Sequence, residues 1–254
     1  MLLKDDWEFN VLGVYNYRKP GPLSHYFDYI VEHHDHIDGD ICEAGVFKGS
    51  SLLATGLLLK ELGSSKQVYG YDTFQGFPPI SHGNDDITKF DYLFREGRIS
   101  RDNYDKAKRN QSFRSVDGTN NQSPENISLS GNFSGVQIEN IQRKMKFLDV
   151  DNVHLVPGPF SSTMTDTRDY PKEIMATLLD CCLYMSYKIT LPFVWNRLSI
   201  GGYIFLDEYY SLKFPGAQIA TDEFFENRID KPHKHKLEMG VFERWYVRKL
   251  NMDE

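Results

Sequence analysis

The sequence has no apolar run near the ~20 residues that a membrane-spanning helix needs. Its longest candidate, residues 52–59, is interrupted by Thr55 and Gly56. The first six residues also lack the basic and apolar blocks of a secretory signal peptide. We therefore expect a cytoplasmic protein with no membrane partner.

Positive charge and cysteine are also scarce. The chain has 29 Lys and Arg residues against 36 Asp and Glu residues, which gives a net charge of −7 at pH 7. A nucleic-acid partner requires a basic surface that neutralises phosphates, so we expect no partner of this class. Three cysteines, of which Cys181 and Cys182 are adjacent, are too few for a disulfide framework and fit a reducing compartment.

The length of 254 residues suits one elaborated α/β domain, which we expect to span residues 1–254. Residues 1–38 are expected to form an N-terminal arm followed by a helix. Residues 79–134 are a long polar insertion with an apolar cluster around Phe90, so we expect short helices that form a lid over a site. For residues 115–130 an unstructured linker is the alternative, because their composition is very polar.

Short apolar segments of strand length alternate with longer amphipathic segments. The expected strands are 40–44, 67–72, 152–158, 175–180 and 202–207, and the expected helices are 23–36, 50–62 and 135–148. This alternation predicts an α/β fold, a mostly parallel, Rossmann-like sheet with helices on both faces. Residues 237–248, with Gly240 at their centre, predict an antiparallel pair at the C-terminal edge of the sheet.

The first expected strand ends in a turn with two glycines. In the run DICEAGVFKGSS, residues 40–51, Glu43 precedes the turn, Gly45 and Gly49 lie in it, and Ser50 begins a helix. Glycines let a ligand approach the backbone, and a helix start offers free N–H donors. The spacing E-x-G-x-x-x-G differs from the dinucleotide fingerprint G-x-G-x-x-G, so we expect a nucleoside-bearing ligand rather than a nicotinamide cofactor. The alternative is a turn that serves packing alone.

The second expected strand ends at Asp72. In an α/β nucleotide fold, an acidic residue in this place can accept hydrogen bonds from two ribose hydroxyls. Glu43 and Asp72 would then bracket one ligand. The alternative is an aspartate that initiates the turn at Thr73.

Two later strands also end in acidic residues. Asp180 ends the fourth strand, and Asp207 and Glu208 end the fifth. In a parallel sheet these carboxylates converge on the edge that holds Glu43 and Asp72, and carboxylates repel unless they are protonated or bridged by a cation. An all-oxygen set suits a hard ion such as Mg²⁺, with Ca²⁺ and Mn²⁺ as alternatives. Taken singly, each acid also fits a cap or turn residue.

Several motifs, in this order, resemble the macrocin O-methyltransferase (TylF-like) family. They are EAGVFKG at 43–49, YDTFQGFP at 71–78, GPF at 158–160 with Thr163, LDCCLY at 179–184, GGYIFLDEY at 201–209, and PGA at 215–217 with DEF at 222–224. The likeness runs from about residue 39 to the C-terminus. Single motifs are modest signals, but their order is specific.

The resemblance implies a class I, S-adenosylmethionine- and Mg²⁺-dependent O-methyltransferase that acts on sugar hydroxyls. The residues it places in the cofactor and metal sites are Glu43, Gly45, Gly49, Ser50, Asp72, Thr73, Gly158 and Phe160 for the cofactor, and Asp180, Asp207 and Glu208 for the metal. The family often has an acid where Cys182 stands and a tryptophan where Pro159 stands. Because a cysteine replaces the acid at position 182, a metal-binding role of Cys182 is in doubt. We expect Cys182 to be a small buried side chain that serves packing.

The expected chemistry is displacement at a sulfonium carbon by a hydroxyl that a bound cation activates. Asp180 or His82 would accept the proton. The acceptor, a sugar or sugar-containing small molecule, would be recognised by the arm and the insertion. The alternatives are a phenol, amine or lipid-linked glycan acceptor, and a non-catalytic relative that binds a nucleoside or sugar. Aromatic segments near Tyr15 and Phe90 suggest a homodimer.

Overall fold

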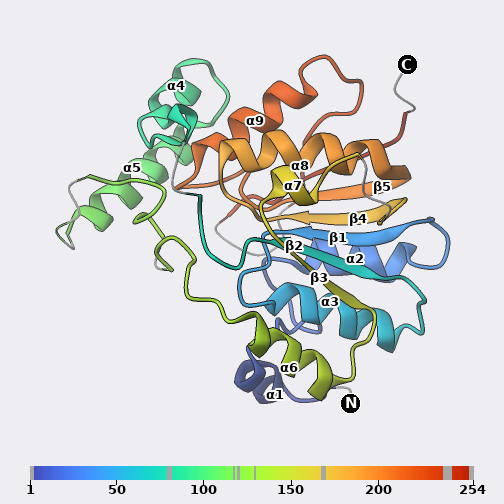
Figure 1. The fold of residues 1–254 in the computed structure, drawn as a ribbon. Helices are drawn as coiled ribbons and strands as arrows, with labels where there is room; N and C mark the ends of the chain where they lie inside the picture. The colour runs from blue at the N-terminus through green and yellow to red at the C-terminus, as the bar shows by residue number, and fades with distance from the viewer. Residues whose placement is uncertain are drawn as a thin grey trace.

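The computed structural model describes residues 3–78, 82–116, 118, 121–128, 130–166, 170–236 and 242–251. A single twisted sheet of seven strands lies between two layers of helices (Figure 1). The strands are β1 Asp40–Ala44, β2 Val68–Asp72, β3 Val153–Pro157, β4 Ile174–Leu179, β5 Leu198–Leu206, β6 His233–Lys234 and β7 Trp245–Arg248. Their order is β3-β2-β1-β4-β5-β7-β6, in which β1 to β5 are parallel. The predicted mostly parallel α/β sheet is thereby confirmed.

Helices cover both faces of this sheet (Figure 1). They are α1 Asp6–Leu12, α2 Ser24–His33, α3 Ser50–Glu61, η1 Gly83–Asp85, α4 Lys89–Arg95, α5 Arg101–Ser115, α6 Ile138–Leu148, α7 Phe160–Thr163, α8 Tyr184–Arg197 and α9 Pro215–Phe225. Successive strand residues point to opposite faces, so β1 sends Ile41 to the core under α2, α3 and α6, and Cys42 to the core under α8 and α9. Both cores consist of fully buried aliphatic and aromatic side chains. None of the described helices is long and apolar enough to cross a membrane.

The N-terminal arm contains one helix that the sequence analysis did not predict. Helix α1 has only seven residues, which is too short for a clear helical period. Its sequence signal is the pair Asp5 and Glu8, because the Glu8 carboxylate accepts the Asp5 backbone N–H at 2.7 Å. Helix α2 ends at His33, three residues earlier than predicted.

The C-terminal strands differ from the prediction in their bounds. β7 is antiparallel to both β5 and β6, as expected for an edge hairpin. The first strand of the hairpin is His233–Lys234, before the predicted start at residue 237. The predicted centre, Gly240, lies outside the described residues.

The insertion contains η1, α4 and α5, so the expected short helices are present. Phe90 and Leu93 are buried against α8 and α9, whereas Phe113 is 70% exposed and takes no part in this core. Two side-chain hydrogen bonds tie the insertion to the body: Asn110 Nδ2 donates to the Leu212 carbonyl at 3.1 Å, and Gln218 Nε2 donates to the Arg98 carbonyl at 3.0 Å. The insertion is therefore docked beside α9 (Figure 1).

Candidate cofactor and metal site

The order of the strands reverses between β1 and β4, and open α/β sheets bind ligands at such a point, at the carboxyl ends of the strands. Gly45 follows β1 there with φ +92°, and a Cβ on it would run into the Asp180 carbonyl group. The Asp180 N–H in turn donates to the Ala44 carbonyl at 2.9 Å. Glycine is therefore required at position 45 because the backbone at the end of β4 packs against it, whether or not a ligand also approaches. The sequence alone does not show this contact.

Substitution of Gly45 by alanine is expected to destabilise the protein by at least about 3 kcal/mol, because backbone strain adds to a clash that no side-chain motion relieves. Gly63→Ala is the matched control, because Gly63 also has positive φ, at +66°, but nothing lies within 4 Å of its added Cβ. The control should cost only about 1 kcal/mol. Denaturant unfolding of the two variants would measure the difference, and equal losses would contradict the assigned clash.

Asp72 lies at the end of β2 and holds in place residues 45–49, the turn expected to bind the cofactor and called the cofactor turn below. Its Oδ2 accepts the backbone N–H groups of Val46 and Phe47, each at 2.8 Å, and its Oδ1 accepts that of Phe74 at 2.8 Å. The bonds to Val46 and Phe47 fix the loop after β1 against the end of β2, and the bond to Phe74 shapes the turn that follows β2. Both lone pairs of Oδ2 are used by these bonds, whereas Oδ1 has a lone pair left that a ribose hydroxyl would use.

The other predicted cofactor residues lie along the same edge. Thr73 forms a turn, in which Oγ1 donates to the Gly76 carbonyl at 3.0 Å. The Gly158 N–H donates to the Asp72 carbonyl at 2.9 Å, and Phe160 begins α7 directly afterwards. Gly49, with φ +78°, is the N-cap of α3. These residues thus form one edge from β3 to the start of α3.

Glu43 has its side chain beneath α3 and is fully buried. It shares the face of Ile41 because both are odd-numbered residues of β1. Its Oε1 accepts the Ser51 hydroxyl at 2.7 Å, whereas Oε2 is buried without a partner. Burial raises the pKa of Glu43 to about 8, although the Ser51 hydrogen bond opposes the shift. An unpaired buried oxygen of this kind requires a water molecule or a polar ligand group.

Three of the side chains after β4 and β5 meet at one point. Ligand atoms of Asp180, Cys182 and Glu208 all lie within 4.8 Å of one another, and Cys182 Sγ is 3.8 Å from Glu208 Oε1. Asp207, the third predicted metal ligand, is not part of this group. Cys182 has φ +60°, a conformation that aspartate and asparagine adopt more readily than cysteine. The position therefore suits the acid that the family often has there.

The acidic cluster, Asp180, Asp207 and Glu208, is poorly solvated. Burial, followed by the negative charges of Asp207 and Glu208, holds the pKa of Asp180 well above its usual range. Burial also raises the pKa of Asp207, and raises that of Glu208 to about 7. Lys213 opposes all three shifts. A divalent cation would relieve this repulsion, and the carboxylate oxygens of Asp180 and Glu208 fit the donor preference of Mg²⁺, whereas the Cys182 thiol does not.

His82, the second predicted proton acceptor, lies on the insertion. It is exposed, its ring stacks on Tyr184 with 4.3 Å between centroids, and none of the contacts among the described residues joins it to the acidic cluster. Its neighbour Asp85, which the sequence analysis missed, is buried. Asp85 Oδ1 accepts the N–H of Tyr184, the first residue of α8, at 2.7 Å. The insertion thus supplies a carboxylate cap to a helix of the body.

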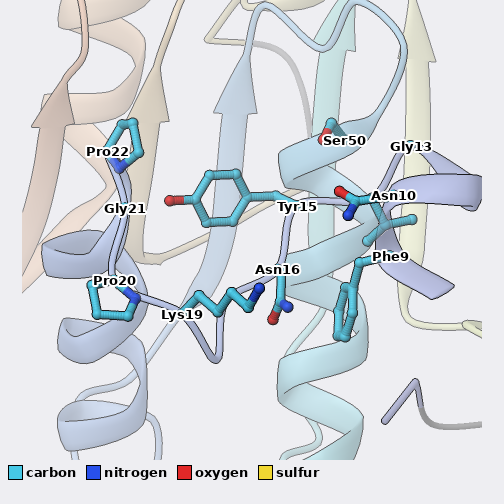
Figure 2. Close-up of a pocket in the computed structure, with 11 residues that line it drawn as sticks. Phe9, Asn10, Gly13, Tyr15, Asn16, Lys19, Pro20, Gly21, Pro22 and Ser50 are labelled. Atoms are coloured by element: carbon cyan, nitrogen blue, oxygen red, sulfur yellow. The ribbon is translucent and has the colours of Figure 1, made fainter. Parts of the chain in front are cut away.

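A pocket of about 420 Å³ adjoins the start of α3 (Figure 2). Figure 2 shows Tyr15 in its middle, between Ser50 and the loop that carries Gly21. The Tyr15 N–H donates to the Ser50 carbonyl at 3.1 Å, and its hydroxyl accepts the Leu23 N–H at 3.1 Å. Burial raises the pKa of Tyr15, and the negative charge of Asp207 adds to the shift. The arm therefore contacts the start of α3, and the charge of Asp207 acts on Tyr15 from a distance.

The expected role of Tyr15 and Phe90 between subunits finds no support in this arrangement. Tyr15 stacks on Phe27 within the chain with 5.3 Å between ring centroids, and Phe90 is only 1% exposed. Both aromatic side chains are thus used inside the fold. The homodimer stays a prediction, and these two aromatic residues do not supply its contact surface.

The sequence model of the Macrocin-O-methyltransferase (TylF) family matches residues 23–123 and 110–245. The chain is 30% identical over 192 residues to Mycinamicin III 3''-O-methyltransferase of Micromonospora griseorubida, which covers 75% of this chain and 61% of the relative. It is 25% identical over 192 residues to Demethyldecarbamoylnovobiocin O-methyltransferase of Streptomyces niveus, which covers 75% and 59%. The chain thus spans about three fifths of the length of the curated relatives it matches.

A solved structure has the same fold. The structure of the O-methyltransferase NovP matches with a TM-score of 0.61 and 17% sequence identity, over 96% of this chain and 80% of that chain. The match shows a class I methyltransferase sheet with helices on both faces.

Proposed function

Because the chain belongs to the macrocin O-methyltransferase (TylF) family, we propose that it transfers a methyl group from S-adenosylmethionine to a hydroxyl of a sugar or sugar-containing small molecule. The observation that carries this proposal is the continuous set of contacts at the edge of the sheet. Asp72 holds the cofactor turn, Gly45 of that turn lies against Asp180, and Asp180 meets Glu208. A nucleoside and an acceptor hydroxyl would be bound side by side at this edge.

In the proposed reaction, Asp72 and the turn residues orient the cofactor. Glu43 lies too deep to touch an exposed ligand, but its free Oε2 would take a hydrogen bond from a group or water beneath the turn. A divalent cation, when bound, lowers the pKa of a coordinated hydroxyl and fixes its oxygen. Asp180 and Glu208 would hold that cation, with Asp207 beside them. Two vicinal hydroxyls of a sugar would fill the remaining positions.

For the proton of the hydroxyl we favour Asp180 over His82. A general base must lie within hydrogen-bond reach of the proton it accepts, and Asp180 belongs to the cluster where the hydroxyl would bind. His82 stacks on Tyr184 at the edge of the insertion. The arm pocket beside Tyr15 and the docked insertion are the surfaces proposed to recognise the acceptor, with residues 79–134 as a lid.

The names of both curated relatives state O-methyl transfer, to mycinamicin III and to demethyldecarbamoylnovobiocin. Glycosylated small molecules are therefore the acceptors to test first. Phenol, amine and lipid-linked glycan acceptors are the alternatives within methyl transfer. A non-catalytic nucleoside-binding or sugar-binding relative is the alternative from another class.

The test is calorimetric titration with S-adenosylmethionine and with S-adenosylhomocysteine, each in Mg²⁺ or chelator, with NAD as control. We expect micromolar binding of both sulfur nucleosides, no binding of NAD, and Mg²⁺-dependent methylation in a screen of sugar diols. Absence of sulfur-nucleoside binding in either condition would contradict the cofactor assignment. Binding without turnover of any acceptor would favour the non-catalytic alternative.

A further inference from the structure

A second pocket, of about 390 Å³, lies on the outer side of the cofactor turn, between α6 and the end of α1. Lys48 belongs to the cofactor turn itself, and α6 contributes Arg143 and Lys144. None of the described residues that line this pocket carries a carboxylate. In a chain with a net charge of −7, three cations around one hollow without an acid are unusual.

These cations are also not used in ion pairs elsewhere among the described residues. Other basic side chains of the neighbouring elements are paired, such as Lys60 with Asp149 at 2.6 Å and Lys19 with Asp6 at 2.6 Å. Lys144 is half-buried, and its burial together with the positive charge of Lys48 lowers the pKa of its ammonium group. Two ammonium groups are therefore held near each other without an anion, at a cost that a bound anion would remove.

The rest of the pocket supplies hydrogen-bond donors and an apolar wall. The side chain of Asn140 accepts a hydrogen bond from the Arg143 guanidinium and so orients it. The N–H of Asn140, near the start of α6, already donates to the Gln137 carbonyl at 2.9 Å, so the donors of the pocket are side chains. Phe147, which is 58% exposed, forms an apolar wall. Three cations and an apolar wall suit a phosphate ester with an organic group.

We propose that this pocket binds the phosphoryl group of a phosphorylated ligand. The site is separate from the acidic cluster and goes beyond the proposed methyl transfer, because binding of the anion requires neither S-adenosylmethionine nor Mg²⁺. Three sources present the same chemistry: free phosphate or pyrophosphate, a soluble sugar phosphate such as a nucleoside diphosphate sugar, and a phospholipid headgroup.

The test is calorimetric titration of the full chain with inorganic pyrophosphate in low salt and EDTA, so that Mg²⁺ does not take part. The variants are Lys144→Gln and Arg143→Gln, and the matched control is Lys146→Gln, an exposed lysine of the same helix that does not line the pocket. Wild type and control should bind alike, whereas Lys144→Gln should weaken binding about tenfold or more, as expected for the loss of a hydrogen bond to a charged group. Parallel titrations with UDP-glucose and sedimentation with phosphatidic acid vesicles distinguish the sources.

Tighter binding of UDP-glucose than of pyrophosphate would support a sugar phosphate as ligand, and vesicle binding that Lys144→Gln abolishes would support a lipid headgroup. Absence of binding to all three probes would overturn the proposal. So would equal losses in Lys144→Gln and Lys146→Gln, because these would show only non-specific attraction. S-adenosylmethionine binding, measured on the same variants, should be unchanged, so this inference and the proposed function fail separately.

Discussion

Asp180→Asn is expected to lower Mg²⁺-dependent methyl transfer by at least about 100-fold, while S-adenosylmethionine affinity stays nearly unchanged. The amide keeps the shape of the side chain but removes the negative charge of Asp180. Only Glu208 would then remain as a charged ligand for the cation at this point. The contact with Gly45 is made by the backbone carbonyl of Asp180, which the substitution retains. Turnover assays and calorimetry on the same preparation would measure the two effects.

The same variant should be more stable than wild type in chelator. Burial, followed by the charges of Asp207 and Glu208, raises the pKa of Asp180, so at alkaline pH, where this carboxyl would ionise, the amide avoids both the desolvation and the repulsion. A gain of about 1 kcal/mol would raise Tm by roughly 2–4 °C in a chain of this size. Asp149→Asn, in an exposed carboxylate whose side chain is 79% accessible, is the control and should change neither activity nor metal response. Equal loss of turnover and cofactor affinity in Asp180→Asn would refute the proposed separation of metal and cofactor residues.

Glu43→Gln is expected to remove a large part of the pH dependence of stability. The pKa of Glu43 is about 8 in the folded protein and near 4.5 when unfolded, so the folded state binds more protons between these values. The contribution of Glu43 is therefore fully present below about pH 4.5 and is lost as pH rises through about 8. At pH 9 the buried charge would cost about 5 kcal/mol, an upper limit, which the variant avoids.

The variant should match wild type near pH 5 and exceed its Tm by roughly 10 °C at pH 9. The Ser51 hydroxyl can still donate to the glutamine oxygen, so the one hydrogen bond of Glu43 is kept. The acidic cluster is present in both proteins, so its own titration largely cancels; the variant also removes the charge of Glu43 that helps to raise the pKa of Asp180. Glu139→Gln, in an exposed residue of α6, is the matched control. Thermal melts without cofactor or metal would give the curves, and parallel curves for wild type and Glu43→Gln would exclude the assigned cost.

The order of the parallel strands and the helices α2, α3 and α6 were predicted from the sequence because hydrophobic periodicity is a local property. Helices α7, α8 and α9 were not predicted. The strands after Gly39, Gln67 and Asn152 were predicted to within one or two residues. Helix α1 was missed because seven residues give too short a period, and β6 because two residues give none. The strand-end acids were recognisable for the same local reason, since Asp72, Asp180 and Asp207 each follow an apolar run.

The detailed arrangement of the site depends on pairs of residues that lie far apart in the chain. Asp72 bonds the backbone of Val46 and Phe47, 26 and 25 residues away, and Asp85 caps Tyr184, 99 residues away. No local sequence pattern predicts such contacts, because the segment around each of these residues has an ordinary turn or helix sequence. Lys48, Arg143 and Lys144 likewise show no pattern in the sequence that predicts a site. They line one pocket only because the cofactor turn packs beside α6.

The sequence by itself thus determined a parallel α/β sheet, a glycine turn after its first strand and a row of acids at its carboxyl edge, because period and spacing are local. Only the tertiary structure decided what these residues do to one another. It buried Glu43 beneath α3, placed the Asp180 carbonyl where Gly45 has no Cβ, and brought Cys182 beside Glu208. Desolvation and charge repulsion, which set the pKa values of the site, depend on that burial and on those neighbours.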